Sequence, residues 1–143
     1  MGNDDPPRLR DGDKLMELKR ILYVEDDDDI RTVAAMALEM IGDFVVETCA
    51  SGHEALEKAA AFAPDLLLLD VMMPGIDGPE TLARLRRKPS FADTPAVFFT
   101  AKGQSDEIAR LKALGAVGVV SKPFDPGQLS DELRRLWEHA HGG

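Results

Sequence analysis

The run Leu66-Leu67-Leu68-Leu69-Asp70 decides the fold of this 143-residue chain. Four leucines with no polar residue among them are typical of a strand buried on both faces, at the centre of a parallel sheet. Four further β-type runs lie at Ile21–Val24, Phe44–Val46, Ala96–Phe99 and Val117–Val120. We therefore expect five strands, with Leu66–Leu69 as a central one.

Segments of helical periodicity alternate with these runs, at about Asp28–Ile41, Gly52–Phe62, Gly78–Lys88, Gln104–Leu114 and Asp125–His139. Turn or capping residues precede each segment, and Asp28 is the expected N-cap of the first. Parallel strands need crossover connections, which helices supply. The pattern predicts an α/β fold in which helices cover both faces of a parallel sheet.

The composition narrows the classes of protein and of partner. The chain has 17 Lys and Arg against 26 Asp and Glu, a net charge of −9, which disfavours direct binding to nucleic acid or to an anionic membrane. Its single cysteine, Cys49, excludes an internal disulfide framework and fits a reducing compartment. No apolar run approaches the ~20 residues of a membrane span. We expect a cytoplasmic protein.

The length predicts one compact core with short flanking segments. Residues 1–19 contain Pro6-Pro7 and few apolar side chains, so we interpret them as a flexible leader with a helical turn just before Arg20. Residues 20–140 form the domain, and residues 141–143 form a short tail.

Polar side chains follow the predicted strands, at the edge of the sheet where ligands bind in such folds. Glu25-Asp26 come after the first strand, Asp70 after the third, Thr100 after the fourth and Lys122 after the fifth. Converging carboxylates repel one another unless a cation is present, and Mg²⁺ prefers such oxygens. An aspartate can accept a phosphoryl group, whose oxygens a lysine and a hydroxyl would then stabilise.

Four motifs in this order resemble the receiver domain of two-component response regulators, of the single-domain chemotaxis-regulator type. They are Ile21-Leu22-Tyr23-Val24-Glu25-Asp26-Asp27, Leu69-Asp70-Val71-Met72-Met73-Pro74-Gly75-Ile76-Asp77-Gly78, Phe99-Thr100-Ala101 and Ser121-Lys122-Pro123-Phe124. The resemblance covers about Arg20 to His139. It implies a doubly wound, flavodoxin-like (βα)₅ fold with a five-stranded parallel sheet in the order 2-1-3-4-5.

The resemblance also implies a role for each acid. Asp70 would be the phosphoacceptor, and Mg²⁺ would be the cofactor. Asp26 would bind the ion directly and Glu25 largely through water, while Asp70 and the backbone carbonyl of Met72 would complete the protein ligands.

Further implied roles concern the switch and the partners. Thr100 and Lys122 would contact the phosphoryl group, and the peptide bond before Pro123 would be cis. The domain would act as a phosphorelay signalling module and not as an enzyme, promoting only its own Mg²⁺-dependent phosphorylation and dephosphorylation. Its partners would be a histidine kinase or histidine phosphotransfer protein and a downstream protein target. It would be a monomer or a weak phosphorylation-dependent dimer, signalling through its fourth helix, fifth strand and fifth helix.

Three residues depart from the family pattern. Val119 stands where an aromatic side chain often swings inward with the threonine, so that switch cannot operate here. Met72 and Lys102 flank the route of the attacking water, and their identity predicts an altered lifetime of the phosphoryl group.

Alternative interpretations stay open. Glu25 and Asp26 also suit a solvated helix start, where acids favour the macrodipole. Asp70 could instead serve a phosphotransferase of the haloacid-dehalogenase type, but those enzymes carry a second aspartate where this chain has Met72. Finally, the chain could be a receiver domain detached from a longer regulator or hybrid kinase. Because only Gly142-Gly143 follow His141, we expect its output to come through binding.

Overall fold

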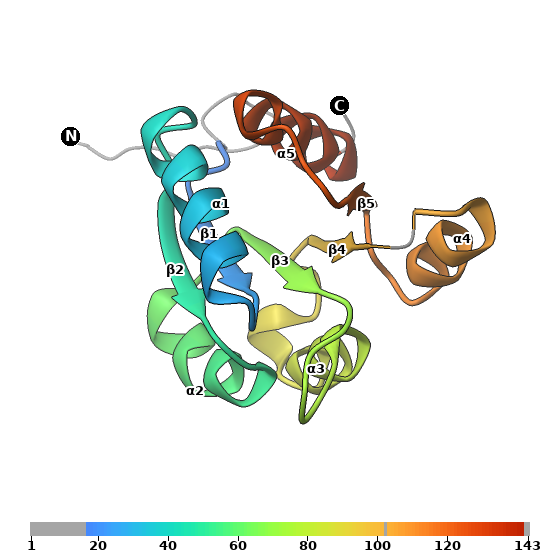
Figure 1. Cartoon of the computed structure of the whole chain (residues 1–143). Helices are drawn as coiled ribbons and strands as arrows, with labels where there is room; N and C mark the ends of the chain where they lie inside the picture. Colours follow the sequence, from blue (N-terminus) through green and yellow to red (C-terminus); the bar gives the residue numbers. More distant parts are fainter. Residues whose placement is uncertain (1–16, 102, 142–143) are drawn as a thin grey trace.

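The computed structural model describes residues 17–101 and 103–141, which form one five-stranded parallel sheet flanked by helices (Figure 1). The strand order is β2-β1-β3-β4-β5, so the predicted fold and strand order are confirmed. The strands are β1 (Arg20–Val24), β2 (Val45–Cys49), β3 (Leu66–Asp70), β4 (Ala96–Thr100) and β5 (Gly118–Ser121). The helices are α1 (Asp28–Met40), α2 (Gly52–Phe62), α3 (Gly78–Arg86), α4 (Ser105–Ala113) and α5 (Pro126–Ala140), with a 3₁₀ turn, η1 (Pro89–Phe91), after α3.

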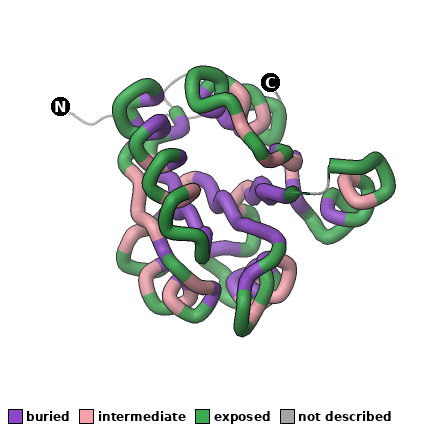
Figure 2. The backbone as a smooth tube through the Cα atoms, in the orientation of Figure 1, coloured by how far each residue is buried: buried purple, intermediate pink, exposed green. Residues whose placement is uncertain are grey.

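The central strand β3 is buried along its whole length, as the leucine run predicts. Its four leucines are fully inaccessible to solvent, and the neighbouring strands β1 and β4 are buried over nearly their whole length (Figure 2). Leu67 and Leu69 point into one hydrophobic cluster, whereas Leu66 and Leu68 point into the other. This alternation is the two-residue repeat of a strand, and it divides the core into two layers.

Each layer of the core belongs to a different set of helices. Helices α1 and α5 cover one face of the sheet through Leu38 and Leu133, and they lie together in Figure 1. The opposite face carries α2 and α3, together with Leu111 of α4. The two sides of the sheet therefore connect to separate parts of the surface.

Two elements differ from the sequence prediction in their extent. Strand β2 runs on to Cys49 because Glu47 and Thr48 lie on a half-exposed edge strand, which needs no continuous apolar run. Helix α3 ends before Lys88 because a residue that precedes a proline, here Pro89, disfavours the helical region. The remaining strand and helix ends lie within one residue of prediction.

The cap of α1 was also predicted at the wrong residue. Asp27, and not Asp28, has the extended backbone of an N-cap, and its Oδ1 accepts the backbone N–H of Ile30 at 2.9 Å. Asp28 lies in the first turn, where its carboxylate pairs with Arg31. A cap must lie outside the helix for its side chain to reach the free N–H groups.

The ends of the chain are described only in part. Glu17, Leu18 and Lys19 contain no helical turn, and the rest of the predicted leader lies outside the described residues. His141 caps α5 and contacts the Trp137 carbonyl, while the remainder of the predicted tail also lies outside. Among the described helices, none combines the length and apolar character that crossing a membrane requires.

The capping geometry makes a testable prediction. Replacing Asp27 with alanine leaves a free N–H group at the start of α1, so the variant should lose about 1 kcal/mol of unfolding free energy in urea denaturation. Asp28→Ala is the matched control, since it removes the same charge from the same turn but only an exposed ion pair, and it should cost less than about 0.5 kcal/mol. Equal losses for the two variants would contradict the assignment of the cap.

Candidate functional site

The carboxyl ends of β1 and β3 bring three acids together. Glu25 and Asp26 follow β1, and Asp70 is the last residue of β3, its hydrogen-bonded neighbour in the sheet. One carboxylate oxygen from each of the three lies within 4.8 Å of the other two. Glu25 and Asp70 are buried, at 1% and 4% exposure, whereas Asp26 is open to solvent. The cluster is therefore closed on the protein side and accessible through Asp26.

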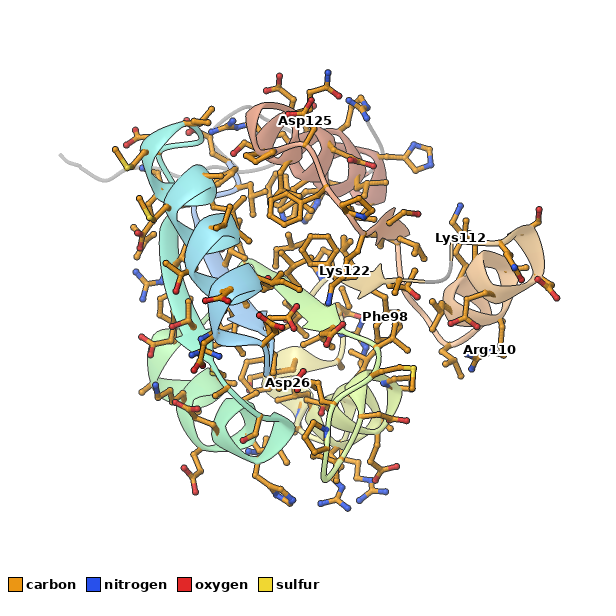
Figure 3. The ribbon with its side chains drawn as sticks, in the orientation of Figure 1. Asp26, Phe98, Arg110, Lys112, Lys122 and Asp125 are labelled. Atoms are coloured by element: carbon orange, nitrogen blue, oxygen red, sulfur yellow. The ribbon has the colours of Figure 1, made fainter. Side chains whose placement is uncertain are left out.

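Lys122 binds two of these acids at once. Its Nζ lies 2.9 Å from Asp70 Oδ1 and 2.9 Å from Glu25 Oε1, and its side chain is 16% exposed. In Figure 3 the lysine reaches into the acid group from the β5 side of the sheet, while Asp26 lies at the end of β1. The lysine follows β5 directly, and the Lys122-Pro123 peptide bond is cis, as predicted.

The backbone and neighbouring side chains orient Glu25 further. Its Oε2 accepts the Asp27 N–H at 3.2 Å, and its Oε1 lies 3.5 Å from the Tyr23 hydroxyl. Arg31 of α1 donates to the Glu25 backbone carbonyl at 2.8 Å. Both carboxylate oxygens thus have donors within the protein, which fixes the side chain in a buried position.

The other predicted site residues lie around this cluster. Thr100 ends β4 and is 3% exposed, and its carbonyl accepts the Lys122 N–H at 2.8 Å. Met72 lies two residues after Asp70, with its side chain 69% exposed. Val119 packs against the layer of the core that contains Leu111. Lys102 lies outside the described residues.

A cavity of about 900 Å³ opens directly over the acids. Asp70, Thr100 and Lys122 form part of its wall, and Met72 lies on the loop beside them. Arg110 of α4 also lines the cavity, 2.7 Å from Glu107 in an exposed ion pair. The hollow is large enough for a phosphoryl group together with a hydrated cation.

The negative charges at the site outnumber the positive ones. Burial raises the pKa of Asp70 to about 6, with the charges of Glu25 and Asp26 adding to the effect and Lys122 opposing it. Burial works against the Lys122 ammonium, but its hydrogen bonds to Glu25 and Asp70 hold its pKa above the usual value. One ammonium faces three carboxylates, so an oxygen-binding divalent cation fits the donor set.

Comparison with known proteins identifies the family. The model of the response regulator receiver domain matches residues 21–134. The chain belongs to this family. Receiver domains are modules of two-component signalling and are not classical enzymes, which agrees with the resemblance described above.

The relatives of this receiver domain are response regulators. It is 35% identical over 116 residues to response regulator Rre1 of Synechocystis sp., an alignment covering 81% of this chain and 50% of Rre1. It is 38% identical over 126 residues to the transcriptional regulatory protein CseB of Streptomyces coelicolor, covering 86% and 52%. The chain spans about half the length of the curated relatives it matches.

A solved structure has the same fold over almost the whole of its own length. The chemotaxis response regulator CheY4 of Vibrio cholerae superposes with a TM-score of 0.77 at 33% identity, over 83% of this chain and 98% of CheY4. The five-stranded order seen here is therefore that of a known receiver domain.

Three residues at the site escaped the sequence analysis. In the sequence, Tyr23 is one residue of an apolar β-type run. The alternation of apolar and polar residues does not indicate that its hydroxyl lies beside Glu25. From the sequence alone, Arg31 and Arg110 are expected to be solvent-exposed helix residues. The 3.6-residue period of α1 does point Arg31 back towards the end of β1, but Arg110 lines the cavity only because of the way α4 packs.

The raised pKa of Asp70 predicts how stability depends on pH. Its pKa is about 6 in the fold against an ordinary value of 3.8, so the folded state holds the proton more tightly. Without metal, the free energy of unfolding should fall as pH rises from about 4 to about 6. Asp70→Asn removes this titration, and in EDTA at about pH 7 it should raise the unfolding free energy by roughly 1–3 kcal/mol.

Urea denaturation of the wild type and the variant at both ends of this pH range checks the prediction. Asp93→Asn is the control, because Asp93 is exposed and lies before β4, at the opposite end of the sheet from the site. A stability of Asp70→Asn equal to or below that of the wild type at neutral pH would contradict the electrostatic account.

Proposed function

We propose that this receiver domain accepts a phosphoryl group on Asp70 and signals by changing its contacts with other proteins. One observation carries the proposal: Asp70 is a buried carboxylate that ends the central strand, 2.9 Å from Lys122 and beside two further acids, at the floor of an open cavity. Family membership supports the same conclusion. The second aspartate of a haloacid-dehalogenase-type enzyme stands two residues after the nucleophile, and Met72 occupies that position here.

The chemical step is a displacement at phosphorus. A carboxylate oxygen of Asp70 attacks the phosphorus of a phosphohistidine, so that an O–P bond forms and the N–P bond breaks. The imidazole leaves with the electron pair and takes up a proton. The product is an acyl phosphate on Asp70. Its extra negative charge arises inside a cluster that is already acidic, so the reaction depends on countercharge.

Glu25, Asp26 and Asp70 would hold Mg²⁺, together with the backbone carbonyl of Met72. The three carboxylates suit a hard cation, and the exposed position of Asp26 leaves room for retained waters. When bound, the cation neutralises charge that builds up on the phosphoryl oxygens.

Lys122 and Thr100 would make the phosphorylated state a distinct conformer. Lys122 now divides its ammonium between Asp70 and Glu25, and a phosphoryl oxygen would compete for it. Thr100 lies at the cavity wall and would donate its hydroxyl to another oxygen. Phosphorylation would then shift an equilibrium between two arrangements of these residues.

The partners follow from this chemistry. A histidine kinase or a histidine phosphotransfer protein would supply the phosphoryl group, and a downstream protein would recognise the altered surface. We expect the domain to act in the cytoplasm, as a monomer or a weak phosphorylation-dependent dimer, and to promote its own Mg²⁺-dependent phosphorylation and dephosphorylation.

Intact-mass spectrometry with acetyl phosphate tests the proposal. The wild type should gain one phosphoryl group in the presence of Mg²⁺ and none in EDTA. Asp70→Asn should gain none, because an amide oxygen is a poor nucleophile and cannot form the acyl phosphate.

Asp93→Asn serves as the matched control, an aspartate-to-asparagine change at an exposed position remote from the cavity. It should label like the wild type. Undiminished labelling of Asp70→Asn would remove Asp70 from the role of phosphoacceptor.

A second prediction separates binding of the metal from the switch. Lys122→Ala keeps all three acids and should still bind Mg²⁺, but it should lose the change in amide NMR signals on adding acetyl phosphate. Lys112→Ala, which removes an exposed ammonium from α4, should respond like the wild type. A full response in Lys122→Ala would exclude the lysine from the switch.

A further inference from the structure

Tyr23 and Lys122 share one oxygen atom of Glu25. The Lys122 ammonium is 2.9 Å from Oε1, and the Tyr23 hydroxyl is 3.5 Å from the same atom. Tyr23 is completely buried, so its hydroxyl has no access to solvent. In the unphosphorylated protein the Lys122 ammonium is the nearer donor to Oε1, and the Tyr23 hydroxyl is a second, more distant donor to the same atom.

The sharing matters because a donor that leaves Oε1 of Glu25 has to be replaced from within the site. Glu25 is 1% exposed, and its other oxygen already accepts the Asp27 N–H. If Lys122 moved to a phosphoryl group, Oε1 would lose its closest donor. Loss of a donor from a buried carboxylate oxygen is costly, and the adjacent Tyr23 hydroxyl is the other side-chain donor placed to come closer, beside any cation held at the acids.

The ring of Tyr23 continues this contact away from the site. It packs against Phe99 with centroids 6.1 Å apart, and Phe99 packs against Phe124 at 5.3 Å, both at tilted angles that aromatic pairs favour. Lys122 also lies 5.6 Å above the Phe99 ring. Phe124 directly precedes Asp125, the N-cap of α5.

This aromatic column, Tyr23, Phe99 and Phe124, lies on the opposite face of the sheet from Val119. Its members belong to the layer covered by α1 and α5, whereas Val119 packs against the other layer. The column therefore joins the site to α5 along a route that does not pass through the position of the missing aromatic switch.

We propose that Tyr23 is a positioning residue for the phosphorylation of Asp70, whose hydroxyl becomes the main donor to Glu25 when Lys122 turns to the phosphoryl group. The movement of its ring then displaces Phe99 and Phe124 at the start of α5. This role rests on the proposed function of Asp70.

The variant Tyr23→Phe removes only the hydroxyl and keeps the ring in the column. In the unphosphorylated protein Lys122 still serves Glu25, so the melting temperature should stay close to that of the wild type. In the phosphorylated variant Oε1 of Glu25 would have neither of its two side-chain donors, even with Mg²⁺ bound, so the fraction of phosphorylated protein at limiting acetyl phosphate should correspond to an equilibrium roughly ten-fold less favourable. A merely structural role would change the melting temperature instead.

Thr32→Val is the matched control, because it also deletes one hydroxyl, on the exposed side of α1. It should label like the wild type. Equal phosphorylated fractions for Tyr23→Phe and the wild type would overturn the role of Tyr23 while leaving Asp70 as the acceptor. Failure of the wild type to label would overturn the proposed function, and the role of Tyr23 with it.

A direct probe uses the fact that Tyr23 is the only tyrosine in the chain. Incorporation of 3-fluorotyrosine gives one ¹⁹F signal, which should move on adding Mg²⁺ and acetyl phosphate. Lys122→Ala should move it in the same direction without a phosphodonor, since both changes withdraw the ammonium from Glu25. A signal that stays in place, or that moves in opposite directions, would contradict the transfer from one donor to the other.

A separate variant tests whether the movement passes along the aromatic column to α5. Phe99→Leu keeps the Tyr23 hydroxyl but removes the central ring, so the ¹⁹F signal should still move while the phosphorylation-dependent shift of the Phe124 amide signal falls. A full shift of the Phe124 signal would exclude the column as the route to α5.

Discussion

The structure of the site depends on one interaction, the ammonium of Lys122 held between the buried carboxylates of Glu25 and Asp70. Two acids cannot stay ionised side by side in a buried place without a positive charge. The three residues lie at the carboxyl ends of β1, β3 and β5, so the contact requires these strands to be parallel and to end at one edge of the sheet. The all-leucine strand meets this requirement by anchoring Asp70 in the centre of the sheet.

The same interaction would allow the site to act as a switch in the proposed function. Lys122 faces more negative charge than it can neutralise, and burial, with the neighbouring carboxylates adding to it, raises the pKa of Asp70. A cation and a phosphoryl group would both redistribute this lysine among its partners. A site that is already poorly balanced responds strongly to such a change, whereas a fully neutralised ion pair would not.

The two layers of the core give the domain two routes from the site to the surface. One layer contains Val119 and Leu111 of α4, and the other contains Tyr23, Phe99 and the residues of α5. Valine is too small to fill and vacate a pocket as an aromatic ring can. On the other face, Tyr23, Phe99 and Phe124 pack against one another and form a continuous contact between the acids and the start of α5.

The sequence by itself determined the five strands, the alternation with helices and the set of acids at the strand ends. Burial on both faces and helical periodicity both depend on the order of apolar and polar residues over short stretches, which the sequence shows directly. It did not place the cap at Asp27, since adjacent aspartates differ only in backbone angles. It also missed the end of β2 and the 3₁₀ turn, where solvent exposure and a proline outweigh the apolar pattern. Only the tertiary structure decided that Lys122 bridges Glu25 and Asp70 and that Tyr23 lies beside them. These contacts join separate strands, and their distances depend on register and packing across the sheet.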